Sequence, residues 1–182
     1  MKKAIVMILA VLMLTFAACT KDEPAAGPSQ SGETEPANPW HAITEAEAKE
    51  ICVESFNVPE GAENVQWSVM DAEADASGVP GPLVQLAFDL DGLSFTAREQ
   101  VTGDEAADIS GLHYEWTAEI EETLKAGREE LPCKSYRSIG DDGYVDLCTW
   151  FTGDPGTSYS LSVIADDLDG FDLLAIAEAL YR

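Results

Sequence analysis

Hydrophobic and polar residues alternate with a period of two over much of the chain, which is typical of strands with one buried face. The segments expected to be strands are residues 65–69, 83–88, 93–101, 112–124, 129–139, 144–151 and 158–165. Asp89-Leu90-Asp91-Gly92 is a hairpin signal, and pairing Phe88 with Leu93 across it puts the large apolar residues on one face. We therefore expect an antiparallel sheet of about six or seven strands that forms a meander.

The last four segments predict a register that opposite charges support. Turns at 125–128, 140–143 and 152–157 place Glu119 opposite Lys134 and Arg137 opposite Asp146. The expected core face carries Tyr114, Trp116, Ala118, Ile120, Cys133, Ile139, Tyr144, Cys148, Trp150, Tyr159, Leu161 and Val163. The other face carries serines and threonines together with an apolar group.

Two helices are predicted beside these strands. Thr44 and Glu47 fit a capping box at the start of the first helix, which must end before Pro59. In the second helix, Asp169 is the expected N-cap. The apolar stripe of that helix is Leu173, Ile176, Ala177 and Leu180. The prediction is one α+β domain over residues 40–182, with the N-terminal and C-terminal helices packed on one face of the sheet.

The N-terminus has the pattern of an export signal. Two lysines precede an apolar run over residues 4–18, which is too short for a comfortable membrane span. Phe16-Ala17-Ala18-Cys19 resembles the lipobox of bacterial lipoproteins, with Phe16 where Leu is usual. The resemblance implies that residues 1–18 are removed and that Cys19 carries acyl chains such as palmitate. The alternative is an ordinary signal peptide cleaved after Ala18, which leaves a free Cys19.

Residues 19–39 have the composition of a tether. Four prolines alternate with Gly, Ser, Thr, Glu and Ala, and this composition cannot build a core. The chain carries 34 acidic residues against 10 basic ones, a formal charge of −24. That charge argues against binding nucleic acid or an anionic membrane surface, so attachment to the membrane would depend on the lipid.

The C-terminal segment resembles a domain of unknown function. Trp150, Tyr159-Ser160-Leu161-Ser162 and the run from Asp167 to Leu180 carry the resemblance. That domain occurs in lipoproteins and membrane-anchored proteins of Gram-positive bacteria. The resemblance implies a sheet-plus-helix domain outside the cytoplasm, and it supplies no catalytic motif.

Three cysteines remain after Cys19, and export permits disulfides. Cys133 and Cys148 are predicted to be diagonal neighbours on the same face and form the favoured pair. The alternatives are a bond from Cys52 to one of them, or three reduced and buried thiols.

No metal or catalytic site is predicted. Asp167, Asp169 and Gly170 miss the calcium-loop template because Ala165 stands where an Asp is needed. His41 and His113 are the only histidines, and neither has zinc-ligand spacing. The chain lacks the common hydrolase, phosphate-binding and dinucleotide-binding motifs. We expect no cofactor.

Two residue groups are candidate sites. Arg137, Asp146 and Trp116 are expected to cluster on the core face, as a pocket or as a structural ion pair. On the other face, an apolar patch is either an interaction surface or is covered by Trp40 or by the 102–111 loop. The patch consists of Tyr136, Val145, Leu147 and Phe151.

The expected function is that of a lipid-anchored binding or interaction module on the outer face of the cell membrane. Its partner would be an envelope protein or a small ligand. The alternatives are a cell-envelope hydrolase and a sensor or regulator of envelope stress.

Overall fold

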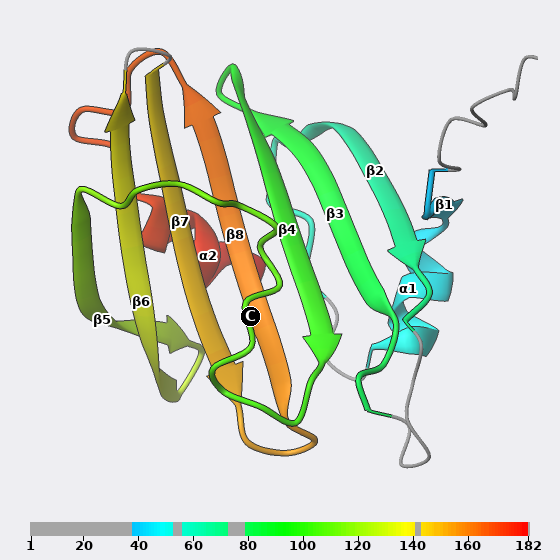
Figure 1. Ribbon diagram of the computed structural model, residues 1–182. Helices are drawn as coiled ribbons and strands as arrows, with labels where there is room; N and C mark the ends of the chain where they lie inside the picture. The colour runs from blue at the N-terminus through cyan, green and yellow to red at the C-terminus, as the bar shows by residue number, and fades with distance from the viewer. Residues whose placement is uncertain (1–37, 53–55, 73–78, 141–142, 182) are drawn as a thin grey trace, which may run out of the picture. The chain divides into compact units, whose positions relative to one another are not determined.

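The computed structural model describes residues 38–52, 56–72, 79–140 and 143–181, which form eight strands and two helices (Figure 1). The elements in chain order are β1 (Trp40–Ile43), α1 (Glu45–Ile51), β2 (Glu63–Met70), β3 (Leu83–Leu90), β4 (Leu93–Val101), β5 (Ala118–Ala126), β6 (Glu129–Gly140), β7 (Gly143–Thr152), β8 (Thr157–Ala165) and α2 (Leu173–Leu180). The mostly antiparallel α+β class is as predicted, but the expected strand number was wrong. The additional strand is β1, which pairs with β2.

All eight strands belong to one sheet in the order β1-β2-β3-β4-β8-β7-β6-β5. The sheet is therefore two meanders, β1–β4 and β5–β8, joined where β4 pairs with β8. The connection from β4 to β5, residues 102–117, must reach the far edge. In Figure 1 it crosses in front of β8, β7 and β6, on the side opposite α2. A single continuous meander was not the right expectation, because β4 and β5 are not neighbours.

The hairpin registers differ from the prediction by two residues where turns are tight. Leu90 pairs with Leu93, so Phe88 lies opposite Phe95. The two turn residues, Asp91 and Gly92, have φ values of 52° and 82°. Tight two-residue hairpin turns use such positive φ values. Strand β3 therefore extends two residues further into the turn than the sequence indicated, whereas β4 begins at Leu93 as predicted.

The β5–β6 hairpin contains the same two-residue displacement. Ala126 pairs with Glu129, which places Glu121, and not Glu119, opposite Lys134. Glu119 nevertheless contacts Lys134 diagonally, at 3.1 Å from Nζ to Oε1. In the other two hairpins the prediction was correct: Arg137 pairs with Asp146 and Trp150 pairs with Tyr159.

Strand β5 begins later than predicted, at Ala118. Tyr114 and Trp116 therefore lie in the connection and not on the core face. Ile120 and Ile139, also predicted for the core face, are about half exposed. Ile120 is on β5, the strand at the edge of the sheet, and Ile139 is next to the end of β6.

The core lies on the inner face of the sheet, defined by Cys133, Trp150 and Tyr159 of adjacent strands. Trp150 and Tyr159 stack with ring centroids 5.2 Å apart, and Phe56 meets both edge-on. Buried residues of the helices complete this cluster: Ala48, Leu173, Ala177 and Leu180. The opposite surface, which carries Lys134 and Thr149, is called the outer face below.

Capping residues set where the helices begin. Thr44 and Glu47 form the predicted capping box of α1, with reciprocal bonds of 3.2 and 2.7 Å. The N-cap of α2 is Asp172, whose carboxylate accepts from the backbone of Ala175, and not Asp169. Gly170 has a φ of 74°, so the chain still turns between the two aspartates.

The predicted signal peptide, Cys19 and nearly all of the tether lie outside the described residues. Neither α1 nor α2, the helices of the described ranges, has the length and apolar character that a bilayer span requires.

Candidate functional site

The connection over the outer face is held down near its start by hydroxyl groups. The Thr102 and Ser158 hydroxyls lie 2.7 Å apart, and both donate to the Asp104 carbonyl. The backbone amides of Thr102 and Gly103 also donate to the Gly156 carbonyl. The first part of the connection is thus fixed to the start of β8.

Two further groups fix the rest of the connection. The Arg98 guanidinium, on β4, donates to the Ser110 carbonyl at 2.6 Å. Near β5, the Thr117 amide donates to the Arg137 carbonyl and the Ser138 hydroxyl donates to the Glu115 carbonyl. Because the connection is anchored at three places, the space beneath it is formed before any ligand arrives.

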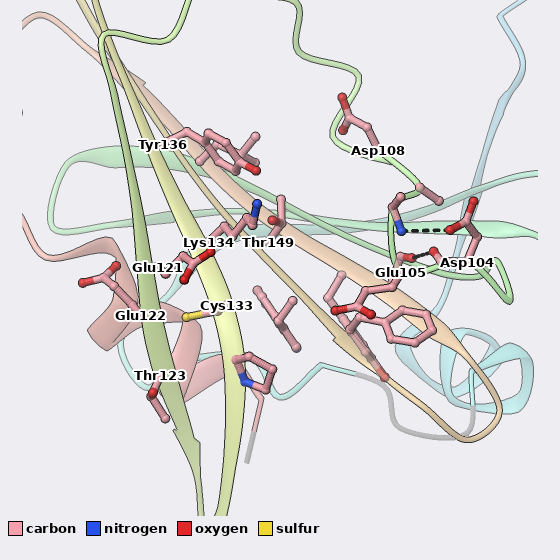
Figure 2. A pocket seen from close by; sticks show the side chains of 18 of the residues that line it. Asp104, Glu105, Asp108, Glu121, Glu122, Thr123, Cys133, Lys134, Tyr136 and Thr149 are labelled. Carbon is pink, nitrogen blue, oxygen red and sulfur yellow. Dashed lines mark hydrogen bonds between the residues drawn. The ribbon is translucent and has the colours of Figure 1, made fainter.

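That space is a groove of about 1060 Å³ between the connection and the outer face. The connection contributes Asp104, Glu105, Ala106, Ala107, Asp108 and Trp116; β5 and β6 contribute Glu121, Thr123, Pro132, Lys134 and Tyr136; β7 and β8 contribute Leu147, Thr149, Phe151 and Ser158. Glu122, Cys133, Trp150 and Tyr159 also border this space, but their side chains belong to the inner face of the sheet. Figure 2 shows Asp104, Glu105 and Asp108 on one side, Glu121 on the other, and Lys134 and Thr149 between them, whereas Glu122 points away across β5 toward α2.

The predicted apolar patch forms part of this groove. Tyr136, Leu147 and Phe151 line it, whereas Val145 is buried outside it. Leu147 is only 4% exposed, so the patch is not an open surface. The sequence left open that the 102–111 loop covers the patch. In the structure the connection contributes to this cover, and it also forms one wall of the groove.

Trp116 lies on the outer face, because its ring packs on Tyr136 with centroids 5.4 Å apart. The Arg137–Asp146 pair is formed on the inner face, where two hydrogen bonds of 2.7 and 2.5 Å join the side chains. The bond to Asp146 raises the pKa of Arg137. Arg137 also donates to the Leu168 carbonyl before α2. The structure therefore separates Trp116 from this pair, which connects the sheet to the segment before α2.

Cys52, Cys133 and Cys148 are free buried thiols in the described part of the chain. Cys133 lies opposite Trp150 and Cys148 opposite Ser135, so the two are the expected diagonal neighbours. Their mutual hydrogen bond lowers the pKa of Cys133 and raises that of Cys148, where burial adds to the increase. The Cys133–Cys148 disulfide stays a prediction.

Negative charge dominates the groove walls. Among the described residues, four carboxylates line its outer-face side, those of Asp104, Glu105, Asp108 and Glu121, against one ammonium group, that of Lys134. Asp104 and Asp108 also organise the connection, since they accept from Ala106 and from Ser110. Glu105 and Glu121 are exposed and make no such bond within the described ranges. The walls therefore have carboxylate oxygens available to an incoming donor.

Within the described ranges, no group of three or more His, Cys, Asp or Glu side chains is placed to hold a metal ion. The two histidines are apart from the groove. His41 is on β1, 3.9 Å from Asp71, and His113 is exposed in the connection. Comparisons with protein-family models, curated proteins and solved structures found no match to this chain.

Sequence reasoning did not place residues 104–108 and Glu121 on two walls of one groove. Residues 104–108 and Glu121 are separated in the chain, and they border one groove only because the connection from β4 must cross the sheet to reach β5. Alternation in Tyr114-Glu115-Trp116-Thr117 imitated a strand and shortened the expected loop. The useful signal was the length of the connection, because a long loop without a helix or strand of its own is often functional.

Proposed function

We propose that this chain is a lipid-anchored, extracytoplasmic binding module whose ligand site is the groove on the outer face. In this arrangement both helices cover the inner face, and the outer face is left for the ligand. The observation that carries the proposal is the preformed groove, in which hydrogen bonds hold the connection above aromatic and aliphatic side chains. Ligand sites are typically concave, mostly apolar and largely formed in advance.

Photo-crosslinking tests the binding site. A benzoylphenylalanine at Tyr136, in the groove, is expected to give a discrete adduct in cells that make the acylated protein. The control carries the same probe at Ile164, which is 52% exposed and does not line the groove. Adducts at neither position, or equal adducts at both, would contradict the proposed site.

The lipid anchor is supported by the Lys2-Lys3 pair, the apolar run and the Phe16–Cys19 motif. Two acyl chains give stable attachment where one chain would be marginal. In a bacterium that processes lipoproteins, labelled palmitate is expected in the wild type and not in Cys19→Ala. Unlabelled wild-type protein that retains residues 1–18 would refute the anchor.

A cell-envelope hydrolase is the second candidate, because carboxylates line both sides of the groove. Paired carboxylates are the groups that cleave glycosidic bonds. Turnover of purified cell-wall glycan that Glu121→Gln abolishes, with the fold intact by circular dichroism, would favour this candidate over binding alone.

A further inference from the structure

The groove has acidic walls on both sides of an apolar floor. Glu105 lies on the side of the connection and Glu121 on the side of β5 (Figure 2). Both are exposed, and in the described ranges neither carboxylate is used by a hydrogen bond that holds the fold. A ligand that lies along the groove would therefore meet negative charge on either side.

The floor suits long aliphatic or aromatic contacts. Tyr136 and Phe151 are partly exposed, and Trp116 packs on Tyr136 at one end. Lysine and arginine side chains bury their methylene stems along such surfaces and place their charge at the rim. Aromatic faces add an attraction for the cationic head.

The one cation that lines the groove in the described part of the chain does not oppose such a ligand. The Lys134 ammonium lies 3.1 Å from Glu119, and this hydrogen bond raises the pKa of Lys134. Its charge is compensated by a carboxylate that does not itself line the groove. The carboxylates of Glu105 and Glu121 therefore remain available to charges from outside.

Charge also decides among the occupants. A second copy of this chain carries −24 and would be repelled, as would nucleic acid. Residues 20–37 of the same chain contain four acids and one lysine, which also disfavours them. At about 1060 Å³ the groove is at the upper end of the range for ligand pockets, roughly 300–1,000 Å³, which leaves room for an extended segment.

We propose that the groove binds an extended, lysine- and arginine-rich peptide segment of another protein, with basic side chains on the two acidic walls and apolar ones on the floor. This inference rests on the proposed function and specifies its ligand. Electrostatic complementarity of this kind contributes specificity and fast association.

The test is fluorescence anisotropy with the full folded chain and a short fluorescein-labelled peptide in which Arg and Lys alternate with Leu. We expect saturable binding that weakens about tenfold in Glu105→Gln/Glu121→Gln, because two charge pairs are lost. Trp116→Ala is expected to weaken binding as well, through the lost aromatic contact. Rising salt should weaken binding to the wild type more than to the double variant.

The matched control is Glu60→Gln/Glu63→Gln, which removes the same charge from exposed residues outside the groove. Equal weakening by this control would overturn the proposal, since it would show general attraction to an acidic protein. Equal binding of a peptide with Glu in place of Arg and Lys would also overturn it. If spermine displaced the labelled peptide at the same concentration of positive charge as unlabelled peptide, the proposed peptide ligand would be wrong, and a small polyamine would be the better ligand class.

The two proposals fail separately. If the crosslink at Tyr136 forms but the basic peptide does not bind, the site stands and the ligand class is wrong. If the crosslink is absent as well, the groove is not a ligand site.

Discussion

At the scale of single residues, the most unusual environment is that of Cys52 beside Glu99. Glu99 is fully buried in the sheet, between Val84 and Tyr159 on the neighbouring strands. Cys52, at the end of α1, is 8% exposed. Burial, and then the charge of Glu99, raise the pKa of the Cys52 thiol. The folded state therefore favours the protonated thiol.

This environment predicts a loss of stability at alkaline pH. The unfolded chain releases the Cys52 proton near pH 8.5 and the folded chain only at higher pH, so the contribution is complete below about pH 8.5 and decreases above it. We expect the wild type to lose up to about 1.4 kcal/mol per pH unit more than Cys52→Ala between these two pKa values. Urea unfolding of both proteins from pH 7 to pH 10 measures the difference. Parallel pH profiles would show that Cys52 is not buried as described.

The Arg137–Asp146 pair predicts an asymmetric response to substitution. The Asp146 side chain is 7% exposed and that of Arg137 is 28% exposed. Arg137→Met leaves a buried carboxylate without its partner, and we expect a loss of about 2–4 kcal/mol in unfolding free energy. Arg137→Met/Asp146→Leu should recover part of that loss, because no unpaired charge remains.

Chemical denaturation checks this prediction, with Lys134→Met as the matched control in an exposed pair. The control should leave the unfolding midpoint unchanged, since exposed ion pairs add little. If Arg137→Met left the unfolding midpoint unchanged, the pair would not be a structural connection between the sheet and the segment before α2.

At the scale of elements, tight turns decide the register of the sheet. Gly127 and Gly143 both have positive φ values, 61° and 111°. A Cβ at Gly143 would lie 2.6 Å from the Ala165 carbonyl oxygen, whereas nothing lies within 4 Å at Gly127. An added side chain would therefore meet only backbone strain at Gly127, but both backbone strain and a steric clash at Gly143.

Gly127→Ala is expected to cost about 1 kcal/mol, the strain of a left-handed residue alone. Gly143→Ala should cost clearly more, because β7 must shift away from the end of β8. Thermal unfolding of the two variants measures the difference. Equal midpoints would contradict the close approach at Gly143.

These turns also show which parts of the fold a sequence can predict. Alternation identified seven strands, and the Thr44–Glu47 capping box identified the start of α1, because both signals are local. The register failed by two residues at Asp91-Gly92 and at Gly127. There, apolar or small residues such as Leu90 and Ala126 continue the strand into the turn.

The candidate site was harder to predict for a physical reason. Tyr136, Leu147 and Phe151 were found from their shared face, which depends only on strand periodicity. That Glu105 and Glu121 line one groove was not predicted, since it depends on the pairing of β4 with β8, which sends the connection across the sheet. No local pattern encodes which strand edge will receive a distant partner.

At the scale of the whole molecule, negative charge opposes compaction. With 34 acids and 10 basic residues, the folded chain repels itself. We expect the melting temperature to rise by a few degrees as NaCl increases from about 10 mM to about 200 mM, because screening shortens the range of the repulsion. Differential scanning calorimetry measures this, and a fall over that range would contradict it.

The pairing of β4 with β8 has a consequence for biosynthesis. A ribosome releases β3 and β4 early, but Val101 meets Thr157 only when the last strand has emerged. Until then the hydrogen-bonding groups along β4 are open to any passing strand, and unpaired edges invite misassembly. Nascent chains stalled before residue 157 should therefore need a chaperone, and release from that chaperone should coincide with the arrival of β8.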